Sequence, residues 1–476
     1  MSSTMLYGLA DSLVVLVGGL LLLPLYTAAL SQQEFGSYVA VRTNLELLTY
    51  LLHFGLISAV SRLYFDYRAK REGQAYIVSI ALWFPVQLLL VVLFLLVAGG
   101  SIWSELSPGV RMMPNLMFVL GIAAANFYFN LTTATLRAEQ RVKTFVSVQL
   151  GAAAVLVGAA FFLLVGRHLG LAGLMGALFA SAFAGALALP LALPLALHGG
   201  VRLRIYPDHV RQSLRYAMPI VAGLLSFFIL NRISILILQR YVPVADLALY
   251  GLAQQMALIV AVVAAAFGKA LQPILFAADL ERLPSLMQQT MAIYVLALSG
   301  VTSMILIFGA NIIAIIAPAS YQAAHPIMLI LVCAAFVYAL TLASDTAVLC
   351  MRKPGASAAI TAGGAALSAL LSLSLIPRAG LVGGAAALLI ASIVLAATAD
   401  QMARRLAGFG NLRPALCGFG VITITAVVAN CIDGLGVSEA AALAMRGFFA
   451  AVLIAAHLAI LFKLMRAHDN QPVTAA

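Results

Sequence analysis

Charged residues are the scarcest part of this sequence. Asp, Glu, Lys and Arg make up 9% of its 476 residues, whereas hydrophobic residues make up 64% and the mean hydropathy is +1.07. A water-soluble globular domain has roughly 25% charged residues, so that class is excluded. No polar stretch is long enough to form a separate soluble domain. The composition therefore predicts an all-α integral membrane protein, because helices satisfy their own backbone hydrogen bonds in lipid.

The sequence also lacks the motifs of catalytic and cofactor sites. It has no Walker sequence, no His-Glu-x-x-His motif and no loop long enough for a catalytic domain. Its four cysteines lie in or beside apolar runs without metal-ligand spacing: Cys333, Cys350, Cys417 and Cys431. We therefore expect no enzyme activity, no catalytic residue, no metal and no cofactor. The first apolar run, Met5 to Leu30, is too long for the hydrophobic region of a cleavable signal peptide.

What the sequence does contain is a series of apolar runs from end to end. Each is about 20 residues or longer, the length that an α-helix needs to cross roughly 30 Å of hydrocarbon. Caps, Gly or Pro breaks and charge clusters divide the chain into about 14 predicted transmembrane helices. Their predicted starts lie near residues 5, 37, 76, 112, 144, 171, 214, 245, 286, 323, 355, 381, 414 and 440.

Lys and Arg residues gather in alternate loops between these runs. If the N-terminus is cytoplasmic, the outer loops hold only Arg111, Arg167, Arg240 and Arg378. This asymmetry follows the positive-inside rule, so both termini are predicted to be cytoplasmic. The net charge of +11 is then explained by basic loops beside anionic headgroups. We expect membrane lipids as partners, and no nucleic acid.

An internal repeat organises the predicted helices. The motif "EFGSY" at Glu34–Tyr38 is matched by "DLALY" at Asp246–Tyr250, an offset of 212 residues, and a Phe-Gly pair follows each motif. A second match, "GLAGLMGALFASA" and "GLVGGAAALLIAS", begins at Gly170 and Gly380. The offset covers six helices, an even number, so the halves are predicted to be parallel repeats. The predicted division is a first six-helix lobe, a second six-helix lobe, and two additional helices with a cytoplasmic tail: residues 1–200, 201–405 and 406–476.

Several of these stretches together resemble a known family. A first run ending in "LYTAALSQQEFGSYVAV", then "FGLISAVSRLYFDY", "LRAEQRVKTF" and "GLAGLMGALFAS", resembles the polysaccharide transport (Wzx-type) oligosaccharide flippases. These belong to the multidrug/oligosaccharidyl-lipid/polysaccharide exporter superfamily. The resemblance covers residues 5–405. One departure is that the second motif has Ala248 where the first has Gly36.

The resemblance implies a flippase of the bacterial inner membrane that works by alternating access. Its substrate would be an undecaprenyl pyrophosphate-linked oligosaccharide unit for exopolysaccharide, capsule or O-antigen synthesis, and a polysaccharide polymerase and glycosyltransferases would be its partners. Three alternatives stay open. These are a peptidoglycan-precursor flippase, a drug/cation antiporter of the same superfamily, and a non-transporting membrane scaffold for a glycan-assembly complex.

Polar residues within the predicted helices are the candidate site residues. A charge there costs about 2.5 kcal/mol or more unless it is paired or hydrated. A guanidinium group matches phosphate oxygens bidentately, and the resemblance places Arg42 and Arg232 near the transport axis. The candidates for substrate binding are Arg232, Arg42, Asn231, Asn126 and Asn130, and those for ion coupling are Asp11, Glu46 and Asp345.

Each charged candidate also has a purely structural interpretation. Arg42 and Glu46 lie four residues apart on one helical face and can simply pair. Arg232 has no acid beside it in the sequence, so it either needs an anion or water or reaches the outer headgroups. Asp11 and Asp345 lie near the inner ends of their helices and can hydrogen-bond a neighbour.

Two polar features have mainly structural interpretations. Asn126 and Asn130, one turn apart, can bind a neighbouring helix or sugar hydroxyls. The turn before the second predicted helix has Ser31 or Gln32 as a cap, with Glu34 favourable in the first helical turn and Gly36 permitting close approach.

Overall fold

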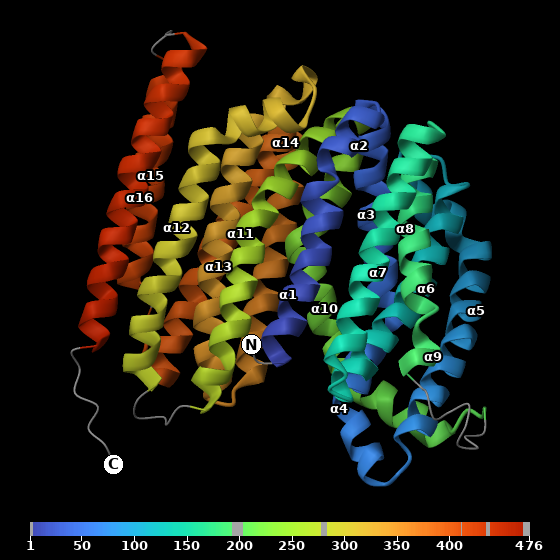
Figure 1. Cartoon of the computed structure of the whole chain (residues 1–476). Coiled ribbons are helices and arrows are strands. Elements are labelled where there is room, and N and C mark those ends of the chain that lie inside the picture. Colours follow the sequence, from blue (N-terminus) through green and yellow to red (C-terminus); the bar gives the residue numbers. More distant parts are fainter. Residues whose placement is uncertain (1–2, 193–202, 278–282, 411, 435–437, 470–476) are drawn as a thin grey trace, which may run out of the picture. The chain divides into compact units, whose positions relative to one another are not determined.

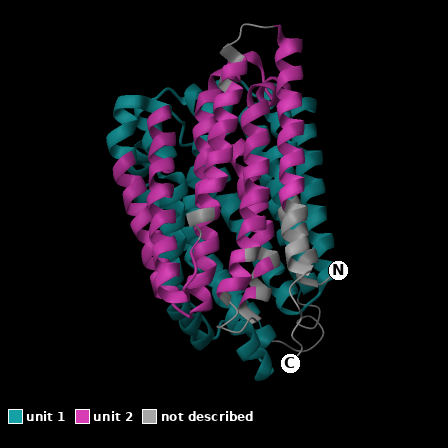
Figure 2. Cartoon of the chain, turned by 90° about the vertical axis from the view of Figure 1, so that its left-hand side faces the viewer, with its two compact units in different colours: residues 1–251, 372–381 teal, residues 252–371, 382–476 magenta. Residues whose placement is uncertain are grey.

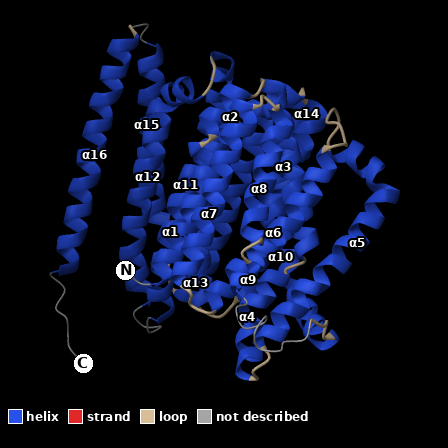
Figure 3. Ribbon diagram, turned by 45° about the vertical axis from the view of Figure 1, so that its right-hand side comes forward, coloured by secondary structure: helices blue, strands red, loops and turns tan. Residues whose placement is uncertain are grey.

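The computed structural model of the chain consists of helices joined by short loops (Figure 1, Figure 3). It describes residues 3–192, 203–277, 283–410, 412–434 and 438–469. Within these ranges no β-strand occurs, and eleven helices are long and apolar enough to cross a membrane. The chain is therefore an all-α, multi-pass membrane protein, as its composition predicts.

The chain has two compact units, which Figure 2 shows in different colours. Unit 1 comprises residues 1–251 and 372–381, and unit 2 comprises residues 252–371 and 382–476. The lobe boundary predicted at residue 200 falls outside the described residues. The division into six-helix lobes stays a prediction of the internal repeat.

Unit 1 holds both motifs, Glu34–Tyr38 and Asp246–Tyr250. Its helices α6, α7 and α8 pack on one another, α3 packs on α6, and α10 packs on α3, α4 and α5. The elements are α1 (Ser3–Leu16), a π-helical turn η1 (Val17–Leu21), α2 (Leu23–Ala29), α3 (Gln32–His53), α4 (Leu56–Ala69), α5 (Gly73–Leu106), α6 (Asn115–Ala138), α7 (Val142–Ala160), a second π-helical turn η2 (Phe161–Gly166), α8 (Gly170–Ala186), α9 (Leu189–Ala192), α10 (Pro207–Tyr241) and the first turns of α11 (Val244–Ala277).

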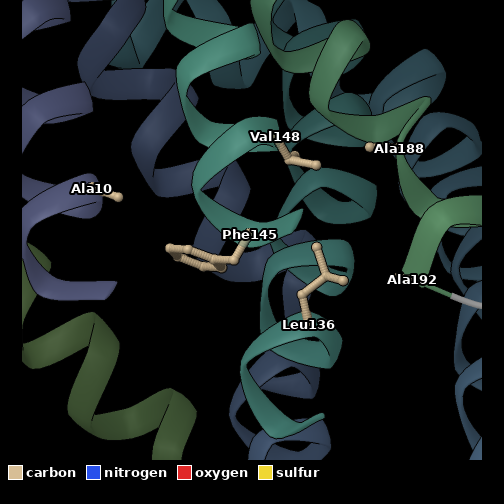
Figure 4. Packing of buried hydrophobic residues seen from close by; sticks show 6 residues of the cluster. All are labelled: Ala10, Leu136, Phe145, Val148, Ala188 and Ala192. Atoms are coloured by element: carbon tan, nitrogen blue, oxygen red, sulfur yellow. The ribbon is translucent and has the colours of Figure 1, made fainter. Parts of the chain in front are cut away.

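A buried apolar cluster fixes α1 within unit 1. Figure 4 shows Phe145 pointing from α7 toward Ala10 of α1. Tyr7 packs edge-to-face against Phe145, and the two ring centroids lie 4.8 Å apart. The cluster consists of Ala10, Leu136, Phe145, Val148, Ala188 and Ala192. This packing places Asp11, the residue after Ala10, beside α6 and α7.

Unit 2 is assembled around α12, which packs on α13, α15 and α16. Two polar contacts hold α16 to α12: Arg446 donates a hydrogen bond to Asn311, and His457 Nε2 lies 3.2 Å from Ser299 Oγ. The elements are the rest of α11, α12 (Leu283–Ile316), a 3-10 turn η3 (Ala319–Ala324), α13 (His325–Cys350), both ends of α14 (Pro354–Ala407), α15 (Leu412–Gly434) and α16 (Glu439–Asp469).

Most predicted starts agree with helix starts, although some predicted helices are divided. Helices α5, α7 and α16 begin at Gly73, Val142 and Glu439, close to the predicted residues 76, 144 and 440. The segment labelled α14 consists of two helices that meet at a kink at Gly380 (φ 52°, ψ −128°), which agrees with the separate helices predicted from residues 355 and 381. The exact count of 14 stays a prediction.

The entry into α3 follows the sequence closely. Ser31 is the N-cap, and its Oγ accepts a hydrogen bond from the backbone N–H of Glu34 at 3.2 Å. The Glu34 carboxylate accepts one in return from the backbone N–H of Ser31 at 2.9 Å. This reciprocal capping box confirms Ser31 as the cap and Glu34 in the first turn.

Two glycines let the starts of α3 and α11 approach closely. A Cβ on Gly36 would lie 1.8 Å from the carbonyl oxygen of Val244, and a Cβ on Gly251 would lie 2.3 Å from Val39 Cγ2. Under the 212-residue offset, Gly36 corresponds to Ala248 and Val39 corresponds to Gly251. One glycine thus lies within the first motif, and the other directly follows the second motif. The close approach predicted for Gly36 is confirmed, and the second motif uses Gly251 in place of a glycine at 248.

Replacing Gly36 with alanine is expected to destabilise the protein. The new Cβ meets a backbone carbonyl, which cannot move without shifting α11, so we expect a loss of roughly 1–3 kcal/mol. Thermal unfolding of the purified variant measures this loss. The control is Gly151→Ala in α7, where nothing lies within 4 Å of a new Cβ, and alanine there should be neutral or stabilising. Equal melting temperatures for the two variants would contradict the close crossing.

Candidate functional site

Two arginines share one carboxylate where α3 meets α10. Glu46 accepts two hydrogen bonds from Arg232, from Nε at 2.7 Å and from Nη2 at 2.9 Å. The Nε of Arg42 lies 3.7 Å from Oε1 of the same carboxylate. The exposed fraction is 35% for the Arg42 side chain and 27% for each of the other two. Partial burial strengthens these interactions relative to an ion pair in bulk water.

This geometry combines the two sequence-based interpretations of the arginines. Arg42 does pair with Glu46 across one helical turn, but the shorter contacts of Glu46 are with Arg232. The expectation that Arg232 needs an external anion or water requires a correction. Arg232 pairs with Glu46, which lies 186 residues earlier in the chain. The group of Arg42, Glu46 and Arg232, called here the shared-carboxylate group, has a formal net charge of +1.

A buried tyrosine holds Arg42. The Tyr38 hydroxyl oxygen accepts a hydrogen bond of 2.6 Å from Arg42 Nη1. Tyr38 is 2% exposed, and its ring centroid lies 6.2 Å from that of Tyr26 and 5.8 Å from that of Phe35. Sequence reasoning treated Tyr38 only as a marker of the repeat. The four-residue spacing between Tyr38 and Arg42 was the signal that could have revealed the contact.

A buried polar chain joins α10 to α3 and α5. Asn44 donates to Ser107 Oγ at 2.5 Å, and Ser107 donates to Gln239 Oε1 at 2.8 Å. All three residues are buried. Next to this chain, Arg240 donates to the Glu105 carboxylate at 2.5 Å. The Asn44–Ser107–Gln239 chain holds α10 against α3, and so it supports the position of Arg232 relative to Glu46, whereas the Arg240–Glu105 pair joins α10 to α5.

The three candidate asparagines have different surroundings. Asn231 Nδ2 donates to the carbonyl oxygen of Phe227, one turn earlier in α10, at 2.9 Å. Asn126 is half-buried and Asn130 is exposed on α6. Among the described residues, no hydrogen bond or ion pair joins Asn126 or Asn130 to the shared-carboxylate group. Their part in substrate binding stays a prediction.

The remaining acids lie elsewhere. Asp11 of α1 accepts hydrogen bonds from Arg137 Nη2 at 3.0 Å and from Gln149 Nε2 at 2.8 Å. Asp11 therefore connects α1 to α6 and α7, as its structural interpretation proposes. Asp345 of α13, in unit 2, accepts a hydrogen bond from Ser357. Ion coupling through Asp11, Glu46 or Asp345 stays a prediction.

The described part of the chain contains no candidate metal centre. No group of three or more His, Cys, Asp or Glu side chains there could hold a metal ion. The chemistry that the shared-carboxylate group offers is the binding of an anion by guanidinium groups. Such groups keep their charge in a low dielectric and present planar sets of N–H donors.

Removing the shared carboxylate is expected to destabilise unit 1. Glu46→Ala takes away the acid that both arginines contact, which in a partly buried site should cost about 3 kcal/mol. Arg42→Ala should cost less, because the two bonds between Glu46 and Arg232 remain. Denaturant or thermal unfolding measures the difference. As a control, Asp66→Ala breaks an exposed pair with Arg62, which should cost less than about 1 kcal/mol. Equal losses for Glu46→Ala and Asp66→Ala would contradict the proposed pairing.

Comparison with solved structures shows which fold this is. The chain resembles "Lipid II flippase MurJ" in an inward closed conformation, with a TM-score of 0.74, 10% sequence identity, and coverage of 96% of this chain and 99% of that chain. It resembles an inward-facing multidrug resistance MATE family transporter of the MOP superfamily, with a TM-score of 0.61, 15% identity, and coverage of 89% and 96%. It also resembles the Vibrio cholerae MATE transporter VcmN, with a TM-score of 0.59, 12% identity, and coverage of 84% and 94%.

Comparison of the sequence itself gives the family. A search of curated protein sequences gives no significant match. A family model described as "Polysaccharide biosynthesis protein" matches residues 4–278, which is more than half of the chain. The resemblance inferred from the motifs is thereby confirmed. The chain belongs to the polysaccharide biosynthesis protein family and has the fold of the MurJ and MATE transporters.

Proposed function

We propose that this protein is a flippase for a lipid (undecaprenyl) pyrophosphate-linked oligosaccharide repeat unit. It would move the unit across the bacterial inner membrane, by alternating access, for exopolysaccharide, capsule or O-antigen synthesis. Membership of a polysaccharide biosynthesis family and a transporter fold support this proposal. The observation that carries the choice of an anionic substrate is the net positive shared-carboxylate group on two membrane helices.

The chemistry of a diphosphate suits this group. A diphosphate carries about two negative charges, and each guanidinium group can donate paired hydrogen bonds to phosphate oxygens. Glu46 competes with the phosphate for the same donors, which limits how tightly the substrate is held. A transporter needs that limit, because it must release its substrate as readily as it binds it.

Energetics favour export of such a substrate and disfavour a cation. An anion that leaves a negative cytoplasm gains about 2.3 kcal/mol per charge for each 100 mV of membrane potential. A net positive site repels organic cations, which argues against a drug/cation antiporter. Polysaccharide polymerase, glycosyltransferases and membrane lipids remain the proposed partners.

A peptidoglycan-precursor flippase is the second candidate. The observation that favours it is the higher TM-score with the lipid II flippase MurJ, 0.74, than with the MATE transporter, 0.61. Cells depleted of their own lipid II flippase distinguish the two candidates. If they grow when this chain is expressed, the second candidate is correct.

Arg232→Ala is expected to abolish export of the glycan. Arg232→Lys keeps the charge but loses the planar set of donors, so export should fall only partly. Surface glycan in a strain that lacks its native flippase measures export, with each variant at a matched membrane level. Arg240→Ala on the same helix is the control and should retain export, because Arg240 is bonded to Glu105 outside the shared-carboxylate group. Wild-type export from Arg232→Ala would refute the proposed substrate site.

The proposed orientation, with both termini cytoplasmic, makes a separate prediction. Ser320 in η3 and Arg71 after α4 are exposed, whereas Ser107 and Ser213 are buried and unsuitable for labelling. In a cysteine-free background, Ser320→Cys should react with an impermeant thiol reagent from the periplasm. Arg71→Cys should react only after permeabilisation. The reverse labelling pattern would show that the orientation is inverted.

A further inference from the structure

The repeated motif places one tyrosine beside each arginine of the shared-carboxylate group. Tyr38 is the seventh residue of α3, and Tyr250 is the seventh residue of α11. Tyr38 accepts the hydrogen bond from Arg42 described above. The Tyr250 hydroxyl is hydrogen-bonded to Ser234, two residues after Arg232, and is close enough to Arg232 for an electrostatic interaction. Equivalent residues of the two motifs therefore meet the two arginines.

Both tyrosines are buried, unlike the arginines that they approach. Tyr38 is 2% exposed and Tyr250 is 1% exposed, whereas the arginine side chains are 35% and 27% exposed. On the Tyr250 side, Ser234 also contacts Ser372, with their hydroxyl oxygens 3.0 Å apart. A long arginine side chain loses conformational entropy when it binds a ligand. A buried neighbour that already orients the side chain lowers this entropy cost of binding.

The glycines of the same motifs explain why the tyrosines can lie so near one site. Gly36 precedes Tyr38 by two residues, and Gly251 directly follows Tyr250. Each glycine lies at the close crossing of α3 and α11. In the first motif the spacing glycine lies within the acid-apolar-small-variable-Tyr pattern, and at the second motif it directly follows the tyrosine.

We infer that Tyr38 and Tyr250 are positioning residues, which orient Arg42 and Arg232 for the diphosphate of a lipid-linked substrate. This inference rests on the proposed function, which supplies the ligand. Tyr38 acts directly on Arg42 through one hydrogen bond. Tyr250 acts on Arg232 through Ser234, which lies two residues after Arg232 on α10 and also contacts Ser372.

The test is a pair of double-mutant cycles. The probe is a short prenyl diphosphate, titrated onto the purified full-length protein in lipid nanodiscs. Tyr38→Phe should weaken binding roughly tenfold, because it removes one hydrogen bond to a charged group. It should weaken binding no further in an Arg42→Ala background. Because Arg232→Ala is expected to abolish binding of the probe, the cycle of Tyr250→Phe with Arg232→Ala is read from melting temperatures, where the two losses should be non-additive.

A matched control separates positioning from general stability. Tyr128 on α6 donates a hydrogen bond from its hydroxyl to the carbonyl oxygen of Ala81 at 3.1 Å. Tyr128→Phe also removes one hydrogen bond in unit 1, but it should leave the affinity for the probe unchanged. The inference is wrong if Tyr38→Phe has no effect on affinity, or has the same effect with and without Arg42.

A second measurement distinguishes failure of this inference from failure of the proposed function. If the wild-type protein does not bind the prenyl diphosphate, the proposed substrate is wrong. The same cycles are then read from melting temperatures, which need no ligand. Non-additive melting temperatures for Tyr38→Phe and Arg42→Ala would support the positioning contact, and additive ones would overturn it.

Discussion

The free-energy cost of placing a charge within lipid is the constraint on which the site depends. An isolated guanidinium group on a membrane helix costs several kcal/mol, so each arginine needs an acid, water or ligand. Glu46 meets this need for Arg42 on its own helix and for Arg232 on α10. A single carboxylate therefore links α3 to α10, which are far apart in the sequence. The buried chain from Asn44 to Gln239 supports the same pair of helices.

The close crossing of α3 and α11 gives that electrostatic contact its geometry. Gly36 and Gly251 allow two helix starts to approach at distances that a Cβ would prevent. Tyr38 and Tyr250, the last residues of the two motifs, are buried by this packing. The close helix approach at the glycines thus accompanies the burial of both tyrosines. The hydroxyl of Tyr38 in turn binds Arg42.

The sequence predicted the features that depend on neighbouring residues. Apolar runs located most helices, the Ser31 and Glu34 cap formed as expected, and the spacing of Arg42 and Glu46 indicated their pairing. It did not predict the partner of Arg232, because no local pattern encodes a contact across 186 residues. The break between the helices predicted from residues 355 and 381 was predicted correctly, because the glycine at position 380 marks the kink within α14.

The remaining positive charge is what makes the group suited to binding rather than only to packing. Two arginines with two carboxylates would be neutral and would gain little from an anion. Two arginines without Glu46 would be costly to hold in lipid and would bind a diphosphate too tightly for release. With one carboxylate, Glu46 offsets part of the free-energy cost of the two arginines when no ligand is bound. A bound phosphate can offset the rest. Under the proposed function, substrate binding and the stability of the α3–α10 contact would therefore be coupled through the same three side chains.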